Sequence, residues 1–426
     1  MQFRAVKGMN DILPEEIGLW HELERAFATT ARLYGFEEVR TPLLEPTSLF
    51  VRSIGDTTDV VQKEMYSFEH HSEQLTLRPE GTASAVRAYV QHNVNASEPV
   101  TRWYYMGPMY RAERPQRGRY RQFFQAGCEV FGDPGPACDA ELLAMLVGLY
   151  QSLGIGDLRV LVNSIGGPES RARYRELLLE FLRPKAAELS TESQSRLEKN
   201  PLRVLDSKSP LDKQAIVGAP STIDALNDAD RAHFEELCAQ LTALEIPFAV
   251  EPSLVRGLDY YSRTLFEIQS DAGDLGAQNT LVGGGRYDGL VKTLGGPDVP
   301  SIGFAMGVER VLLALKGREL GKPPLVFIAP IGNEAVRAGL VLGNRLRALG
   351  IRTEVDGREG SLKSKLRRAN SMGATLALVM GEQEIAQGTI QLKDLAAHTQ
   401  LDVAQSEIVQ RVRERMQAAV PVEANS

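Results

Sequence analysis

The feature that most limits what this chain can fold into is a block of helical sequence enclosed by strand-rich sequence. From about residue 167 to 245 the chain is rich in Leu, Glu, Arg and Ala and carries almost only helical patterning. Short extended runs lie on both sides of the block, at residues 74–77, 102–106, 122–130, 248–250 and 260–269. This order indicates one α+β domain, built around a mostly antiparallel sheet, with a helical insertion.

The first residues predict a helix that packs on this domain. Apolar side chains recur there at spacings of three and four residues: Trp20, Leu23, Phe27, Ala31 and Tyr34. Pro14 stands near the expected first helical position, and Gly35 ends the pattern. A strand interrupted by Pro42 is expected next, over residues 36–44.

A second domain is predicted beyond a polar segment marked by glycine and proline, residues 316–324. Strand patterns (325–330, 351–355, 376–380) alternate there with helix patterns (334–349, 361–372). This alternation is typical of a small α/β domain with a mostly parallel sheet. We therefore predict a core domain over residues 1–320, a linker and the start of the next domain over 321–330, and the α/β domain over 325–420.

The composition excludes several classes of protein. Three cysteines are an odd number, and without any C-x-x-C pair they argue against a disulfide framework and against structural zinc. No apolar run approaches the roughly 18 residues of a membrane-spanning helix, so no membrane partner is expected. The N-terminus lacks the apolar core of a signal peptide, and we expect a cytoplasmic enzyme.

The charge is distributed unevenly along the chain. The formal net charge of −7 argues against a protein that coats nucleic acid along its whole surface. Residues 111–121, however, contain five arginines and one glutamate, a net of +4, and residues 336–370 contain nine Lys or Arg and three acids, a net of +6. These two basic segments predict contact with a polyanion at two separate places.

The arginines of the first basic segment are candidates for holding phosphates. The chain has no G-x-x-x-x-G-K-[ST] loop, and the glycine-rich run 283–289 lacks its lysine, so that run alone is a plain tight turn about as often as a ligand loop. Two arginine-bearing strands joined by a loop could place guanidinium groups on a phosphate chain, with Phe123 as a stacking surface for a base. An exposed basic hairpin is the alternative.

A second candidate is Arg310, in the sequence GFAMGVER of residues 303–310. The pattern predicts a strand that leads into a helix over residues 308–315, with Arg310 in the first turn. A cation is unfavourable there unless an anion lies nearby. A structural arginine on a core helix is the alternative.

These segments together resemble a known family. The strand with Pro42, the arginine at position 111 and the segment 303–310 are similar to the three motifs of class II aminoacyl-tRNA synthetases. Three further peptides resemble the histidyl-tRNA synthetase family: LRPEGT at 77–82, LVRGLDYY at 254–261 and GGGRYDGL at 283–290. The resemblance covers essentially the whole chain. It implies a class II core with an antiparallel sheet and a helical insertion, followed by a C-terminal α/β anticodon-binding domain.

The resemblance also implies an activity and the residues that carry it. Family members activate histidine with ATP and Mg²⁺, release pyrophosphate, and transfer histidine to the 3′ end of histidine tRNA, without a tightly bound organic cofactor. Arg111 and Arg256 would hold the α-phosphate as catalytic residues, and Arg310 would hold the γ-phosphate. Arg119 and Glu113 would belong to the ATP site, and Phe123 would stack on adenine.

The same comparison implies a histidine pocket. Glu80, Thr82 and Gln125 are matched to the ammonium and carboxylate end, whereas Glu129, Tyr260 and Tyr261 are matched to the imidazole end, with Arg256 beside both. The division between the two ends is open. Taken from the sequence alone, each residue is better interpreted as structural: Glu80 as a helix-capping acid and Tyr261 as an ordinary strand aromatic.

Partners follow from the same resemblance. The Pro42 segment implies a homodimer, Arg114 and Gln116 would meet the acceptor end of tRNA, and residues 336–370 would meet the anticodon. Ala112 departs from the larger polar or aromatic residue that is frequent in the family. Two alternatives stay open: a non-catalytic paralogue that regulates histidine biosynthesis, and a class II synthetase for glycine, threonine or proline. The intact peptide around Arg256 and the long C-terminal region argue against them.

Overall fold

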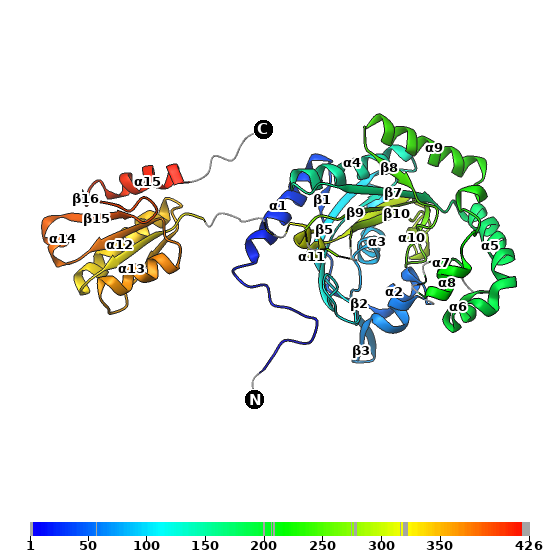
Figure 1. Ribbon diagram of the computed structural model, residues 1–426, viewed down its shortest axis with the longest axis horizontal. Helices are drawn as coiled ribbons and strands as arrows, with labels where there is room; N and C mark the ends of the chain where they lie inside the picture. The colour runs from blue at the N-terminus through cyan, green and yellow to red at the C-terminus, as the bar shows by residue number, and fades with distance from the viewer. Residues whose placement is uncertain are drawn as a thin grey trace. The chain divides into compact units, whose positions relative to one another are not determined.

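The computed structural model describes residues 3–56, 58–198, 201–205, 207, 209–273, 275–276, 279–315, 317 and 323–419. The chain divides into two compact units, Met1–Arg318 and Glu319–Ser426, which are described separately. Figure 1 colours them in chain order, from blue at the N-terminus to red at the C-terminus. Most of the predicted linker, 316–324, lies outside the described residues.

The described part of the first unit is built on a sheet of eight strands, in the order β1-β5-β6-β11-β10-β9-β7-β8. The strands are β1 (Glu37–Glu38), β5 (Thr101–Tyr110), β6 (Gln122–Phe131), β7 (Leu158–Ser164), β8 (Phe248–Val250), β9 (Ser262–Ser270), β10 (Thr280–Arg286) and β11 (Ser301–Gly307). Neighbours from β5 to β7 are antiparallel, and only the edge strands β1 and β8 pair in parallel. The predicted antiparallel core is confirmed.

One face of this sheet is covered by α1 (Ile17–Leu33), α4 (Pro136–Ser152) and α9 (Asp228–Ala243) (Figure 1). The apolar stripe of α1 is buried as predicted, at Trp20, Leu23, Phe27 and Ala31. The helix begins three residues after Pro14, because the carbonyl of Leu13 first accepts the N–H groups of Glu16 and Ile17 in a tight turn. The large core of the unit lies in this layer.

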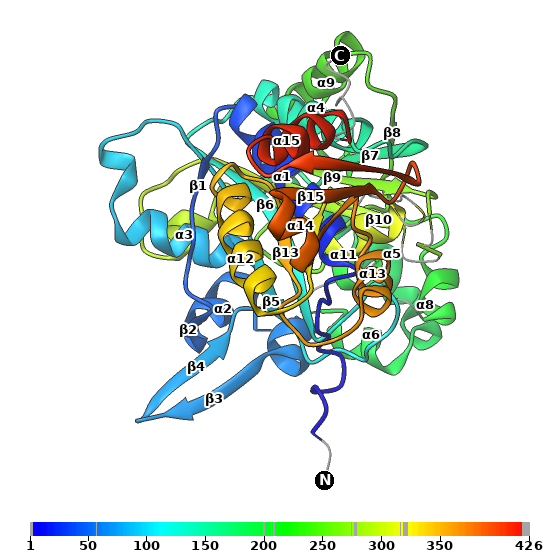
Figure 2. The ribbon, with the colours of Figure 1, turned by 90° about the vertical axis from the view of Figure 1, so that its left-hand side faces the viewer.

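The other face carries α2 (Thr47–Ile54), α3 (Thr82–Gln91) and α10 (Leu290–Thr293), whereas α11 (Val308–Ala314) continues from β11 (Figure 1). A smaller antiparallel sheet stands beside α2, formed by β2 (Leu44–Pro46), β4 (Glu73–Leu77) and β3 (Tyr66–His70). The β3–β4 hairpin extends away from the rest of the unit (Figure 2). His71 and Ser72 turn it with φ values of 47° and 66°.

The helical block follows β7 and is mostly a separate layer. It contains α5 (Pro168–Leu182), α6 (Thr191–Arg196), α7 (Leu202–Leu205), α8 (Pro210–Ala215) and the short 3₁₀ helices 183–188 and 223–225. These elements enclose a core of their own, which includes Tyr174, Leu178 and Leu182. The last helix, α9, instead packs Phe234, Leu237 and Leu241 into the main core. The helical insertion predicted from the sequence is therefore present, and its final helix belongs to the sheet layer.

The second unit is a five-stranded sheet with helices on both faces, as far as residues 323–419 describe it. Its elements are β12 (Val326–Pro330), α12 (Asn333–Ala348), β13 (Thr353–Val355), α13 (Leu362–Ser371), β14 (Leu376–Met380), α14 (Glu382–Gln387), β15 (Thr389–Asp394), β16 (Thr399–Ala404) and α15 (Ile408–Ala419). Helices α12 and α15 cover one face, and α13 covers the other. The α/β class is confirmed.

The sheet of this second unit is less parallel than expected. The order is β13-β12-β14-β15-β16, in which the first three strands are parallel and the last two are added antiparallel. The chain reverses directly between β15 and β16, because the carboxylate of Asp394 accepts the N–H groups of Ala396 and Ala397 in a tight turn. Such a short connection permits only an antiparallel pair.

Candidate active site

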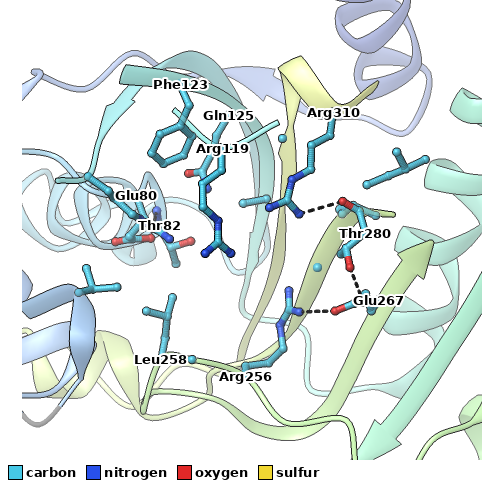
Figure 3. A pocket seen from close by; sticks show the side chains of 18 of the residues that line it. Glu80, Thr82, Arg119, Phe123, Gln125, Arg256, Leu258, Glu267, Thr280 and Arg310 are labelled. Carbon is cyan, nitrogen blue, oxygen red and sulfur yellow. Dashed lines mark hydrogen bonds and ion pairs between the residues drawn. The ribbon is translucent and has the colours of Figure 1, made fainter. Parts of the chain in front are cut away.

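A cavity of about 410 Å³ lies where β6, β9, β10 and β11 meet the 111–121 basic segment, the start of α3 and the peptide before β9 (Figure 3). Most of the residues predicted from the sequence line it: Glu80, Thr82, Arg111, Glu113, Arg119, Phe123, Gln125, Arg256, Tyr260, Tyr261 and Arg310. Positions up to 230 residues apart in the chain thus share one space. The remaining three, Glu129, Arg114 and Gln116, are not among the lining residues.

Two arginines of the cavity are held by backbone carbonyls. Arg111 follows directly after β5, and its Nε donates to the carbonyl of Pro79 at 2.8 Å. Its guanidinium lies 5.4 Å from the centre of the Phe123 ring. Arg310, in the first turn of α11, donates from Nη1 to the carbonyl of Thr280 at 3.0 Å. A carbonyl acceptor orients each guanidinium, and both side chains line the cavity, where an anion could contact them.

Arg256 is fixed by a chain of contacts that ends at Arg310 (Figure 3). Its Nη1 donates to Glu267 at 2.9 Å, and the other carboxylate oxygen of Glu267 accepts the hydroxyl of Thr280 at 2.6 Å. The carbonyl of the same Thr280 is the acceptor for Arg310. A single strand pair, β9 with β10, therefore sets the relative positions of two cations in the cavity.

The glycine-rich run makes room for Arg256. Residues 283–285 lie inside strand β10, so the tight turn of the alternative is confined to the end of the run, at Asp288 and Gly289. A Cβ atom on Gly283 would overlap the guanidinium of Arg256, so a larger residue would expel it from its place. The glycines of this run allow the side chain of Arg256 to lie close to the backbone of β10, and they do not form a phosphate-binding loop.

One glutamate, Glu113, lies near two arginines of the cavity. Glu113 accepts Arg119 at 3.0 Å and lies 3.9 Å from Arg111. Burial lowers the pKa of Arg310, and repulsion from Arg119 adds to this shift. The cationic groups therefore carry an electrostatic cost that a bound polyanion would relieve.

Glu80 closes the opposite end of the cavity and has two roles at once. Its carboxylate accepts the backbone N–H groups of Thr82 at 2.7 Å and Ala83 at 2.8 Å, so it caps α3 as the alternative interpretation held. It also lines the cavity. Burial raises the pKa of Glu80, and the two N–H groups oppose that shift.

Glu129 lies behind this end and is fully buried on β6. It accepts the hydroxyls of Thr82 at 2.8 Å and Tyr105 at 3.0 Å, and also the hydroxyl of Tyr287. Burial raises the pKa of Glu129 to about 8. In this structure Glu129 supports Thr82 from below, because the threonine is the member of the pair that lines the cavity.

Gln125 and two tyrosines complete the polar end. The side-chain oxygen of Gln125 is buried, lines the cavity and accepts no hydrogen bond from the described residues. The rings of Tyr260 and Tyr261 stand 4.7 Å apart and also line the cavity. An unpartnered acceptor beside a buried carboxylate is an arrangement that suits a donor-rich ligand such as an ammonium group.

Comparison with known proteins agrees with this geometry. A model of the histidyl-tRNA synthetase family matches residues 8–311, and a model of an anticodon binding domain matches residues 325–415. The chain is 58% identical over 403 residues to a histidine–tRNA ligase of Sorangium cellulosum, covering 95% of this chain and 94% of that protein. The family is thereby decided.

The chain belongs to the histidyl-tRNA synthetase family.

Further relatives extend the likeness over the full length. A histidine–tRNA ligase of Syntrophotalea carbinolica is 45% identical over 418 residues, covering 97% of this chain and 99% of that one. The crystal structure of apo histidyl-tRNA synthetase from S. aureus matches with a TM-score of 0.82 and 36% identity, over 96% of this chain and 99% of that one. Family membership confirms the resemblance drawn from the motifs, and it excludes the alternatives specific for glycine, threonine or proline.

The two residues assigned to the acceptor end of tRNA lie outside the cavity. Arg114 and Gln116 are exposed in the loop between β5 and β6. The backbone of Gln116 pairs with that of Arg119, donating at 3.0 Å and accepting at 2.9 Å. The loop thus turns Arg119 inward and leaves Gln116 at its tip.

Several residues of this family member's cavity had no signal in the sequence. Glu267 and Thr280 lie in ordinary strand sequence, and only the pairing of β9 with β10 brings them to the arginines. Glu309, next to Arg310 in the quoted motif, accepts the N–H of Phe124 on both carboxylate oxygens, at 2.9 and 3.0 Å. Burial raises the pKa of Glu309 to about 7. Its place in the motif was the available clue.

The described residues contain no candidate metal site and no candidate membrane span. No group of three or more His, Cys, Asp or Glu there could hold a metal ion. None of the helices in those residues is both long and apolar enough to cross a membrane. The prediction that the chain binds no zinc stays a prediction.

Proposed function

We propose that this cavity is where the chain joins ATP and histidine into histidyl-adenylate, before histidine passes to the 3′ end of histidine tRNA. The family is one of histidine–tRNA ligases, so the overall reaction consumes ATP, histidine and tRNA. One observation carries the assignment of the site: Arg111, Arg256 and Arg310 come from three separate segments and line one cavity together with a polar end.

The proposed reaction is an in-line displacement at the α-phosphorus of ATP. A carboxylate oxygen of histidine forms a bond to that phosphorus, and the bond to the pyrophosphate oxygen breaks. Negative charge grows on the phosphoryl oxygens and on pyrophosphate, so catalysis depends on positioning and on fixed positive charge. Arg111 and Arg256 take the α-phosphate and Arg310 the γ-phosphate, because guanidinium groups stay charged at every working pH.

The nucleotide itself would lie along the arginine wall. Phe123 stacks on adenine, and Arg119 and Glu113 complete the ATP site. We expect Mg²⁺ to arrive with ATP as part of the substrate, without a metal site formed by the protein alone. In the free cavity Arg119 and Arg310 repel each other. Bound ATP would place negative charge between them and offset that repulsion.

Histidine would occupy the polar end. The free side-chain oxygen of Gln125 and the carboxylate of Glu80 accept hydrogen bonds from its ammonium group, and Thr82 lines the same cavity. Tyr260 and Tyr261 face the imidazole, and Glu129 acts through Thr82 and Tyr287. An amino acid without a matching donor would leave buried acceptors unpaired, which disfavours it strongly.

Binding of tRNA would use both units. Arg114 and Gln116 at the exposed loop tip meet the acceptor end, where paired hydrogen bonds suit the reading of the extra guanosine. The 336–370 basic segment meets the anticodon stem-loop, chiefly through phosphates and unstacked bases.

The test is ATP–pyrophosphate exchange with each amino acid in turn. Exchange that depends on histidine alone is the expected result. Exchange with another amino acid would contradict the pocket assignment, and silence with all of them would favour the non-catalytic regulatory paralogue.

We also propose a cytoplasmic homodimer. Leu43 and Leu44, beside Pro42 where β2 begins, are 40% and 37% exposed, and a second copy would cover them across a two-fold axis. Light scattering at assay concentration should report twice the chain mass of 46.8 kDa. An active monomer would contradict the dimer without affecting the proposed chemistry.

A further inference from the structure

A second, much smaller cavity adjoins the wall that carries Arg256. It holds about 40 Å³ and is lined both by the helical insertion and by the peptide that precedes β9. Arg256, Leu258 and Tyr261 line this cavity and the larger one, so a single peptide separates the two. From the insertion, Arg171 on α5 is the charged side chain among the described lining residues.

Arg171 contacts the backbone of that peptide. Its Nη1 donates to the carbonyl of Tyr261 at 2.9 Å. Burial lowers the pKa of Arg171, whereas the charge of Asp259 opposes the shift. The guanidinium of Arg171 is therefore buried where it donates to the carbonyl of Tyr261. The side chain of Tyr261 lines the larger cavity.

The first turn of α5, which carries Arg171, is linked by hydrogen bonds to the start of β9. Asp230 of α9 accepts the N–H of Gly167 at 2.8 Å, the hydroxyl of Ser170 at 2.6 Å and Nε of Arg263 at 3.1 Å. The N–H of Arg263 donates to the carbonyl of Gly166 at 2.9 Å. The first turn of α5 is thus bound to a residue two positions after Tyr261.

Arg263 shows that this joint is constrained. Its φ of 44° lies in the left-handed region, which is unfavourable for a residue with a Cβ. The contacts from Asp230 and Gly166 hold it there. Movement of α5 and movement of the Tyr261 backbone are consequently coupled through two separate links, Arg171 on one side and Arg263 on the other.

We propose that Arg171 is a positioning residue, through which the helical insertion holds the peptide from Arg256 to Tyr261 in the geometry that histidine activation needs. The inference rests on the function proposed for the larger cavity. Without Arg171 the carbonyl of Tyr261 loses a buried donor, and the peptide relaxes toward other partners. A misplacement of about 1 Å at a reacting centre costs roughly 100-fold in rate.

The test compares two substitutions on the same helix. Arg171→Gln removes the reach to Tyr261, whereas Arg175→Gln, one turn later, removes a contact within the insertion, from Nη2 to the carbonyl of Glu198 at 2.6 Å. Histidine-dependent pyrophosphate exchange is measured per active site, counted by the burst of adenylate. Arg171→Gln should lower kcat/KM for histidine by about 10- to 100-fold, with the KM for ATP within about twofold. Arg175→Gln should leave both within about twofold.

A conservative variant separates positioning from simple loss of fold. Arg171→Lys keeps a charge and a donor on a shorter side chain, so its kcat/KM for histidine should fall by less than in Arg171→Gln. It supplies the measurement if Arg171→Gln does not fold. A kcat/KM for histidine per active site that equals the unmodified value in both variants, with activity lost only in proportion to the folded fraction, would overturn the inference.

The two proposals fail in different ways. If the unmodified chain shows no histidine-dependent exchange, the proposed function is overturned and this inference with it. If the unmodified chain exchanges normally and Arg171→Gln matches Arg175→Gln per active site, only the role of Arg171 is overturned.

Discussion

The guanidinium of Arg256 occupies the space that a side chain at position 283 would fill. Glu267 forms an ion pair with Arg256 at 2.9 Å and accepts a hydrogen bond from the hydroxyl of Thr280. At the scale of single residues the cavity is therefore a set of charges whose positions are set in advance, and preorganised charge is the larger part of catalysis at a developing anion.

Replacing Arg256 tests this directly. Arg256→Ala should lower histidine-dependent pyrophosphate exchange by about two to three decades, because a fixed cation at such a site contributes roughly 3–4 kcal/mol to the transition state. Histidine binding, measured by calorimetry, should change little, because Gln125 and Glu80 remain. Near-normal exchange in this variant would remove Arg256 from the catalytic set.

Glu129 gives a prediction about pH. Its pKa is about 8 in the folded chain and about 4.5 when the chain is unfolded, so the folded state binds its proton more tightly. As pH rises from about 4.5 to about 8, the unfolded chain is favoured increasingly, by at most about 1.4 kcal/mol per pH unit, and above 8 the effect is constant. The contribution of Glu129 to stability is thus fully present below pH 4.5 and is lost through this window.

The measurement compares Glu129→Gln with the unmodified chain in denaturant unfolding, without ligands, from pH 5 to pH 8. The free energy of unfolding should fall less with pH in the variant, because glutamine does not titrate. Other titrating groups are common to both proteins and cancel in the difference. Parallel curves would show that Glu129 is ionised in the folded chain throughout this range.

At the scale of elements, the loop between β5 and β6 separates two tasks. The full antiparallel register from Thr101 paired with Phe131 to Tyr110 paired with Gln122 fixes both of its ends. Its inner part turns Arg111, Glu113 and Arg119 into the cavity, whereas its tip is exposed. A substitution at the tip can therefore alter tRNA contacts without disturbing ATP.

Gln116→Ala is the test of that separation. Exchange with histidine should stay within about twofold, because the side chain does not line the cavity. Transfer to tRNA should fall several-fold, since one bidentate base contact is worth about 1–3 kcal/mol. The matched control is a tRNA that lacks the extra guanosine, for which the variant and the unmodified chain should differ little. An equal loss on both tRNAs would assign Gln116 to the phosphate backbone or to the loop structure.

At the scale of the whole molecule, each unit encloses its own apolar core. The first has its large cluster between the sheet and α1, α4 and α9, and the second has clusters on both faces of its sheet. A domain with its own core can fold alone. The cavity is lined entirely by residues of the first unit.

A deletion of residues 323–426 tests this division into two units. The remaining chain should keep histidine-dependent pyrophosphate exchange, because the described cavity is complete without the second unit. Aminoacylation should fall severely, because the 336–370 basic segment, which we propose contacts tRNA phosphates, is lost. Circular dichroism and light scattering control for folding and assembly. A truncated chain that charges tRNA as well as the full chain would refute the anticodon assignment.

Local patterning in the sequence determined the elements of this protein. The stripe from Trp20 to Ala31 defined the buried face of α1, and the strand predicted at 122–130 lies within β6. Residue spacing carries such information, because side chains three and four positions apart share a helix face. The family motifs likewise pointed to Arg111, Arg256 and Arg310, whose chemistry is legible from residue type.

Only the tertiary structure decided how those residues are held. In the pairing of β9, β10 and β11, Gly283 stands opposite Glu267 on one side and Ala305 on the other. Arg256 finds its partner and its space through that register, and Glu129 lies beneath Thr82 because β6 passes behind α3. The link from Arg171 to Tyr261 joins residues 90 positions apart. Contacts of this kind depend on which distant strands and helices meet, and that is settled by packing of the whole unit and not by neighbours in the chain.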